Sequence, residues 1–299
     1  MNKFLIFIFV INFTRLLSAD AAEYGIAMTS TPVLNSPDFK ALFGGARGAA
    51  LKTDRCGQMR ELEYIALPGT VFTIVKKLPV GSVSIYQVET DDYAAPANVR
   101  LYVDGRFLTL ESAVPKPVRR LLPSREEIIL ELRGSVGSPY VWGGNIPNGV
   151  PEFSAAFNND AWDDGRKRKI LAGLDCSGLL YHATGGWTPR NTSQLTEIGR
   201  RVAVAGKQSA EIAALLQPLD LIVWNGHVII VLDRQTAIES RLVCGTPGNG
   251  GVVLTPLSQR IAEIMRARRP ANAWSGDKKN RNIFVVRRWY AQKGALPED

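Results

Sequence analysis

The sequence is poor in the residue types that build disulfide scaffolds and metal sites. Among its 299 residues are three cysteines and two histidines. Three cysteines are too few for a disulfide scaffold, although one bridge and one spare thiol fit the count. With neither an HExxH motif nor paired CxxC motifs, the sequence has no pattern typical of a zinc site. We therefore expect neither a metal nor an organic cofactor.

The amino terminus also lacks an apolar run long enough to span a membrane. Residues 4–11 are apolar without a break, but eight residues fall well short of the roughly 20 that a span needs. Lys3 precedes this run, and Ala19-Asp20-Ala21 follows it with the small-x-small pattern that signal peptidase accepts. We expect residues 1–21 to be an export signal, so that the mature protein is periplasmic or extracellular without a membrane or lipid anchor.

The overall composition is close to that of a globular protein. Apolar residues make up 45% and charged residues 21% of the chain, which excludes collagen, wholesale disorder and a multi-span membrane protein. The length favours two domains. The formal charge of +8 favours a polyanionic or carboxylate-rich partner, and nucleic acid, an anionic membrane and a bacterial wall all fit that description.

Two segments of different character are joined by a proline-rich stretch. Residues 24–113 contain short β-rich runs separated by Gly and Pro, including an Asp104-Gly105 pair typical of a hairpin turn, and predict a small β-barrel. Residues 114–123 hold three prolines and three basic residues and predict a linker. Ser124 then has the properties of a helix N-cap, and it opens a second domain over residues 124–290.

The second domain mixes helix and strand patterns. A short helix is predicted over residues 176–184, and apolar strands are predicted over residues 219–225, 227–232, 237–243 and 283–289. The pattern indicates an α+β fold.

Cys176 lies where a polar turn changes into the predicted helix. At a helix N-terminus the unpaired backbone N–H groups and the helix dipole favour the thiolate, which is the nucleophilic form. Cys176 is thus a candidate nucleophile, with an inert buried cysteine as the alternative.

His227 and Glu239 are polar residues within otherwise apolar strands. A hairpin centred on residue 233 would place them directly opposite each other. The Glu239 carboxylate could then accept the Nδ1 proton of His227 and leave Nε2 facing a thiol, as nucleophilic catalysis requires. The alternative is a structural pair in the core. The other histidine, His182, lies about 240° around the helix from Cys176, so we expect a structural role for it.

Several motifs together resemble the NlpC-type cysteine peptidases, which cut bacterial peptidoglycan. The likeness covers about residues 124–290 and is carried, in order, by PYVWGG at 139–144, LDCSGL at 174–179, PRNT at 189–192, LDL at 219–221 and GHV at 226–228. It implies a papain-like core, in which a helix-borne cysteine packs on an antiparallel sheet. Residues 24–113 resemble the bacterial SH3-like domains that accompany such peptidases.

The resemblance assigns roles to individual residues. It implies that Cys176 is the nucleophile, that His227 is the base and that Glu239 is the third catalytic residue. The candidate substrate-binding residues are Tyr140, Trp142, Asp175 and Ser177.

The sequence departs from the family pattern at three places. Glu239 stands where His, Asn or Gln is usual, and Leu219 stands where Gly is usual. Residues 145–173 are longer than expected between two motifs. This insertion could line or cover the groove, but we expect it to be a solvated loop.

The family implies hydrolysis of the bond between γ-D-glutamate and the following diamino acid of a peptidoglycan stem peptide. We expect a monomer that acts on peptidoglycan or muropeptides at the cell wall, with no nucleic acid partner. A non-catalytic wall-binding module, and an amidase or acyl transferase with the same Cys-His site, are alternatives.

Two further sets of residues allow more than one interpretation. Glu61 and Glu63 could meet a substrate ammonium or form a solvated strand face, and pairing of Cys56 with Cys244 is left open.

Overall fold

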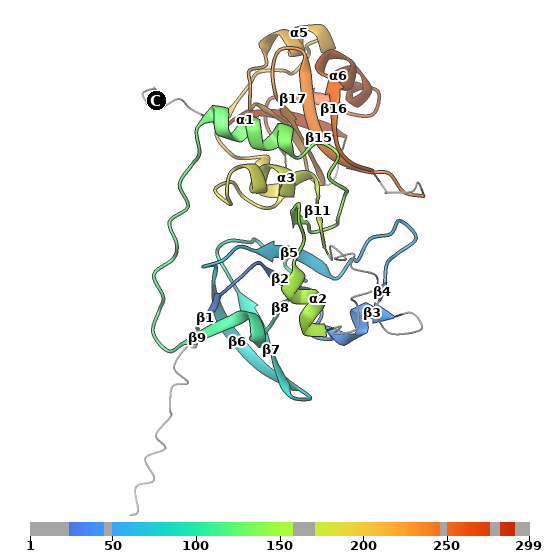
Figure 1. The fold of residues 1–299 in the computed structure, drawn as a ribbon. Coiled ribbons are helices and arrows are strands. Elements are labelled where there is room, and N and C mark those ends of the chain that lie inside the picture. Colours follow the sequence, from blue (N-terminus) through green and yellow to red (C-terminus); the bar gives the residue numbers. More distant parts are fainter. Residues whose placement is uncertain (1–23, 45–49, 158–170, 246–249, 276–281, 291–299) are drawn as a thin grey trace, which may run out of the picture.

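The computed structural model describes residues 24–44, 50–157, 171–245, 250–275 and 282–290. The predicted export signal and residues 158–170 of the insertion lie outside the described residues. Figure 1 shows two lobes joined by an extended linker, with the amino-terminal β-sheet in one lobe and the carboxy-terminal sheet and its helices in the other.

The amino-terminal lobe is an antiparallel sheet of seven strands in the order β5-β2-β8-β7-β6-β1-β9. The β-rich character predicted for residues 24–113 is therefore confirmed. The short strands β3 and β4 pair with each other outside this sheet, next to the 3-10 helix η1 (Lys40–Leu42). The strands are β1 Tyr24–Ala27, β2 Thr31–Leu34, β3 Phe43–Gly44, β4 Ala50–Leu51, β5 Leu62–Ala66, β6 Val71–Val80, β7 Val83–Glu89, β8 Leu101–Asp104 and β9 Leu108–Glu111.

The hairpin predicted at Asp104-Gly105 is wrong. Asp104 instead caps the 3-10 helix η2 (Gly105–Phe107), accepting a hydrogen bond from the backbone N of Arg106 at 2.9 Å. This turn joins β8 to β9, and the two strands are not neighbours in the sheet. Strand β8 pairs with β7 and β2, whereas β9 pairs with β1. The side chain of Asp104 thus stabilises a crossover in place of a hairpin.

The linker and the first helix agree with the sequence analysis. Residues 114–123 form neither helix nor strand. Helix α1 (Arg125–Gly134) begins with a capping box, in which the Ser124 hydroxyl accepts from the Glu127 backbone N and the Glu127 carboxylate accepts from the Ser124 backbone N. Such reciprocal bonds satisfy two of the free donors at a helix start.

The carboxy-terminal lobe is built on an antiparallel sheet in the order β12-β18-β13-β14-β15-β16, to which β17 adds in parallel beside β18. This confirms an α+β fold of mostly antiparallel sheets. The strands are β12 Arg200–Arg201, β13 Leu221–Trp224, β14 His227–Val231, β15 Thr236–Leu242, β16 Gly250–Pro256, β17 Arg269–Ala271 and β18 Ile283–Arg288.

Helices cover both faces of this sheet. Helices α1 and α3 (Cys176–Ala183) pack on one face against Val228, Ile230 and Ile238. Helices α5 (Ser209–Leu215) and α6 (Leu257–Met265) pack on the other face against residues such as Ile229. The alternation of buried residues along β14 explains the layering, because successive side chains point to opposite faces. The short helix α4 spans Thr192–Leu195, and the two-residue strands β10 (Asn145–Ile146) and β11 (Gly173–Leu174) pair beside α3.

The described ends of the insertion are not solvated, contrary to the sequence-based expectation. Helix α2 (Pro151–Phe157) extends into the amino-terminal lobe (Figure 1), where Val150, Phe153 and Leu171 are buried. Their partners there include Phe39. The insertion therefore fastens the two lobes together through an apolar cluster.

A disulfide bond gives a second connection between the lobes. It joins Cys56, in the segment before β5, to Cys244, after β15. The sequence left this pair open. A structural disulfide is consistent with export to an oxidising compartment. Within the described residues, no helix is long and apolar enough to span a membrane.

Removal of this disulfide is expected to lower the free energy of unfolding by about 4 kcal/mol in a Cys56→Ser/Cys244→Ser variant. The bridge closes a separation of 188 residues, and a cross-link over a loop of that size restricts the unfolded chain strongly. Denaturant unfolding measures the change, and a reducing agent added to the wild type should produce the same loss. An unchanged unfolding midpoint in the variant would contradict a stabilising role for the bridge.

Candidate active site

The site begins with the first turn of helix α3. Asp175 is the N-cap, and its Oδ1 accepts a hydrogen bond from the Gly178 backbone N at 2.6 Å. Cys176 is the first residue of the helix, is 7% exposed and is a free thiol. A side chain at Gly178 would collide with the carbonyl oxygen of Gly144, so the glycine lets the PYVWGG segment lie against this turn.

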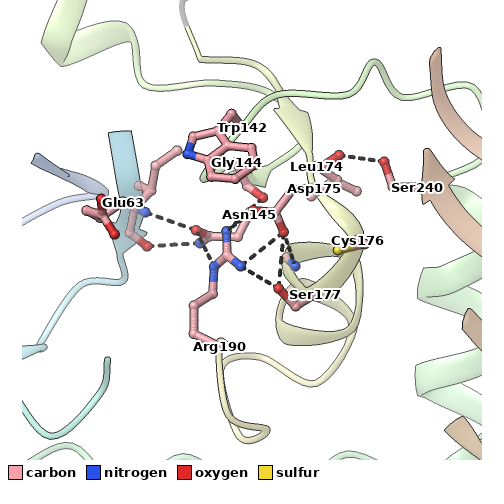
Figure 2. A network of polar contacts seen from close by, with 12 residues as sticks. Glu63, Trp142, Gly144, Asn145, Leu174, Asp175, Cys176, Ser177, Arg190 and Ser240 are labelled. Carbon is pink, nitrogen blue, oxygen red and sulfur yellow. Dashed lines mark hydrogen bonds and ion pairs between the residues drawn. The ribbon is translucent and has the colours of Figure 1, made fainter. Parts of the chain in front are cut away.

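A buried arginine stabilises this first turn through hydrogen bonds to its side chains. The side chain of Arg190 is 2% exposed, and its guanidinium donates to both oxygens of Asp175, at 3.0 and 2.7 Å, and to Ser177 Oγ at 2.9 Å. Figure 2 shows Arg190 reaching between Asn145 and Asp175, with the Cys176 sulfur on the far side of the helix start. The side-chain amide of Asn145 bonds the backbone of Ile65 in β5, so the network also spans the lobes. This role of Arg190 was not predicted from the sequence.

The structure brings Cys176, His227 and Glu239 together. The His227 imidazole is hydrogen-bonded to the Glu239 carboxylate, between Nε2 and Oε2 at 2.7 Å, and the Cys176 side chain lies near enough to the imidazole to raise the pKa of His227. The Cys176 thiol also faces the carbonyl oxygen of Gly226 at 3.9 Å. The predicted use of the two ring nitrogens is therefore wrong. Nε2 faces the carboxylate, which leaves Nδ1 for the sulfur.

The predicted register of the β14–β15 hairpin is also wrong. The pairs are Ile230 with Ile238 and Val231 with Ala237, so the hairpin is centred on residue 234 and not on residue 233. A one-residue displacement of the centre moves His227 two positions along β15, to a diagonal position relative to Glu239. Long side chains still meet across such a diagonal.

A further residue that sequence reasoning missed holds Glu239 from the opposite side. Arg260 of helix α6 donates from Nε to Glu239 Oε1 at 2.6 Å and from Nη2 to Oε2 at 3.0 Å. A signal exists in the sequence, because Arg260 is three residues after the buried Leu257 and four before the buried Ile264. An arginine at that spacing lies beside the apolar face of the helix.

The electrostatics of the pair favour two opposite charges. Burial lowers the pKa of His227, but its hydrogen bonds with Cys176 and Glu239 raise it by more, and the result is a pKa of about 9. Burial raises the pKa of Glu239, whereas hydrogen bonds from His227 and Arg260 lower it by more, so this pKa lies below its usual value. An imidazolium facing a carboxylate follows from both shifts.

These shifts predict a pH dependence of stability. The raised pKa of His227 stabilises the fold fully below pH 6.5, and this contribution is lost as the pH rises through about 9. The lowered pKa of Glu239 stabilises the fold above pH 4.5, and its contribution is lost as the pH falls through the folded-state value. The difference in unfolding free energy between wild type and His227→Gln, measured from pH 4 to 10, should be largest between about pH 4.5 and 6.5 and should reach at most about 3 kcal/mol. A flat difference would contradict the charged pair.

Tyr140 lies near Cys176, and Trp142 follows it two residues later in the same segment. Burial raises the pKa of Tyr140, and the nearby Asp175 and Cys176 raise it further. Trp142 is 39% exposed, and the Arg60 guanidinium lies over its ring at 4.3 Å. Gln58, which is buried, accepts from the Trp142 backbone N at 2.8 Å. The amino-terminal lobe thus supports the segment that carries both aromatic residues.

The remaining candidates have contacts inside the protein. Asp175 and Ser177 bond to Arg190 and to helix α3, so they hold the start of this helix, and their expected binding of substrate stays a prediction. His182 bonds Glu131 of α1 at 2.7 Å, away from Cys176, in agreement with a structural role. The Glu63 carboxylate accepts from Asn35 and Tyr93, so it is not a free anion on a strand face.

Leu219, which stands in place of a usual glycine, adopts a positive φ of 71°. Its backbone N still donates to the carbonyl oxygen of Val231 at 2.7 Å, so the turn before β13 is kept at the cost of strain on a non-glycine residue.

A cavity of about 680 Å³ lies in the amino-terminal lobe, between β6, β7 and the linker, and neither Cys176 nor His227 lines it. Among the described residues, no cluster of three His, Cys, Asp or Glu side chains could hold a metal ion.

Comparison with known proteins adds no assignment. No protein-family model matches the chain, and no curated protein matches it.

Proposed function

We propose that the protein is an exported cysteine peptidase of the NlpC type that hydrolyses the stem peptides of peptidoglycan. The observation that carries the proposal is the position of the His227 imidazole, which is hydrogen-bonded to a buried carboxylate and whose pKa is raised by a nearby free thiol at a helix start. A nucleophile, a base and a group that orients the base are the parts that covalent acyl transfer needs.

In the proposed reaction the Cys176 thiolate attacks the carbonyl carbon of the scissile amide. The oxyanion that forms is bound by the backbone N–H of Cys176, which is one of the helix N-terminal amides without an intrahelical acceptor, and Tyr140, whose pKa is raised by the nearby Cys176, assists it. The imidazolium of His227 then donates its Nδ1 proton to the leaving amine. Water, deprotonated by the now neutral imidazole, hydrolyses the thioester and returns the proton to the site.

The choice of bond follows from the resemblance of the motifs. It favours the amide between γ-D-glutamate and the following diamino acid. Trp142, two residues after Tyr140, is 39% exposed, and we assign it as an aromatic surface for the substrate. The excess of 36 basic over 28 acidic residues attracts the carboxylate-rich wall.

The experiment is to incubate purified muropeptides with the wild type and with Cys176→Ala and to measure the product masses. We expect the wild type to release the fragment beginning at the diamino acid, and we expect the variant to leave the substrate uncut. Uncut substrate with both proteins, together with retained binding, would replace the proposal with a wall-binding module. Release of a lactoyl-containing glycan free of peptide would identify an amidase, and a product joined to an added amine would identify an acyl transferase.

A further inference from the structure

Glu239 has an unusual set of partners for a residue that orients a catalytic imidazole. Its Oε2 accepts from His227 Nε2 at 2.7 Å and from Arg260 Nη2 at 3.0 Å, while its Oε1 accepts from Arg260 Nε at 2.6 Å. The guanidinium therefore binds both carboxylate oxygens, and the imidazole shares one of them. Such two-point binding fixes the plane of the carboxylate as well as its position.

Burial makes this second partner necessary. The Glu239 side chain is 1% exposed, and a buried carboxylate is stable as an anion only when it is paired. His227 alone cannot keep Glu239 ionised throughout the reaction, because the imidazole loses its positive charge when it gives up its proton. Arg260 stays charged over the whole working range of pH, so it can keep Glu239 ionised when the imidazole becomes neutral.

The other charged groups around Glu239 are weaker or indirect. From its own strand, Arg241 lies 3.8 Å from Oε1 and is 37% exposed, so water screens it. From helix α6, Glu263 accepts from Arg260 Nη1 at 3.1 Å and holds the guanidinium in place. From β14, the facing group is His227, and the Cys176 side chain of α3 lies near that imidazole.

We propose that Arg260 is a positioning residue of the site, which keeps Glu239 ionised and in plane so that the imidazole of His227 stays directed at Cys176. This rests on the proposed function for its biological meaning, but its test does not need a substrate. Arg260 touches neither the thiol nor a reacting atom, and it acts through the carboxylate. A series of ion pairs and hydrogen bonds therefore runs from Glu263 on helix α6 through Arg260 and Glu239 to His227, beside the sulfur of Cys176.

The test uses the rate at which iodoacetamide alkylates Cys176, measured against pH. Cys176 is the one cysteine outside the disulfide, so intact mass reports its modification directly. In Arg260→Gln, Glu239 should take up its proton at higher pH, and the acid limb of the alkylation profile should move up by at least about 1 pH unit. Arg241→Gln should move it less. The exposed Arg266, which follows the last residue of helix α6, gives the matched control, Arg266→Gln, which should leave the profile unchanged.

The outcomes separate a positioning role from a structural one. An unshifted acid limb in a folded Arg260→Gln protein would overturn the proposal, even if its melting temperature falls. If that variant does not fold, Arg260→Lys, which keeps the charge and loses the two-point contact, decides the matter. An upward shift supports the proposal, and a profile identical to the wild type overturns it. A shifted limb in a protein that cuts no muropeptide would refute the proposed function and leave the role of Arg260 standing.

Discussion

Replacement of Cys176 with alanine should lower the rate of stem-peptide hydrolysis by at least about 10⁴-fold. The reason is that the proposed acyl-enzyme cannot form without the sulfur, and removal of a nucleophile that acts as a unit with its base costs most of the rate enhancement. The measurement is kcat/KM on a muropeptide with the wild type and the variant at equal concentrations. KM should change little, because the thiol contributes to the reaction and not to ground-state binding.

The fold should tolerate this change. Cys176 is small, its thiol faces the carbonyl of Gly226, and its side chain lies near His227. Cys176→Ser, which preserves the shape of the side chain, serves as the matched control and should be nearly as inactive, because a hydroxyl is a much weaker acid than a thiol. Activity of either variant above one tenth of the wild type would contradict the assignment of the nucleophile, provided that unfolding midpoints are similar.

Replacement of Arg190 with methionine should have the second largest effect, a loss of about 3–5 kcal/mol in the free energy of unfolding. The substitution leaves the Asp175 carboxylate buried without its charged partner, and removal of one member of a buried ion pair usually costs this much. It also removes the donors to Ser177 and Gly144. Denaturant unfolding gives the change in stability, and activity should fall with it because the N-cap of α3 holds Cys176.

A second substitution separates the loss of the pair from loss of packing. Asp175→Asn in the Arg190→Met background removes the stranded charge, so the double variant should recover part of the lost stability. Additive losses of unfolding free energy in the double variant would contradict a stabilising ion pair between Arg190 and Asp175 at the start of α3. A cost below about 1 kcal/mol for Arg190→Met alone would contradict it as well.

Local patterns in the sequence predicted the parts of the site that depend on neighbouring residues. The apolar run ending in Leu232 gave β14, and the change from polar turn to apolar helix at Cys176 gave the start of α3. The capping residues Ser124 and Glu127 gave the start of α1. Each depends on interactions within a few residues, which a sequence displays directly.

The details of the hairpin could not be derived in the same way. Its register depends on how residues 233–235 make the turn, where Asp233 Oδ1 accepts from the Gln235 backbone N and shifts the centre by one position. Because side chains alternate with a period of two, His227 and Glu239 kept a common face despite this error. The choice of ring nitrogen depended on the direction from which Glu239 approaches, which the sequence does not contain.

Long-range partners were the largest omission. Arg260 is 21 residues from Glu239, Arg190 is 15 residues from Asp175, and Cys56 is 188 residues from Cys244. No local pattern joins these pairs, since packing of helices, sheet and lobes brings them together. The apolar ends of the insertion were misjudged for a related reason, because charged residues dominate its middle and conceal the cluster around Phe153.

The most direct measurement is the titration of the His227 imidazole by NMR, which needs neither substrate nor turnover. With two histidines in the chain, a His182→Gln variant identifies the signal. Convergence of a sulfur, an imidazole and a carboxylate predicts a midpoint of about 9 in the wild type, lowered toward 6.5 in both Cys176→Ala and Glu239→Gln. A wild-type midpoint near 6.5 that neither substitution moves would show that His227 meets neither partner, and the proposed active site would have to be abandoned.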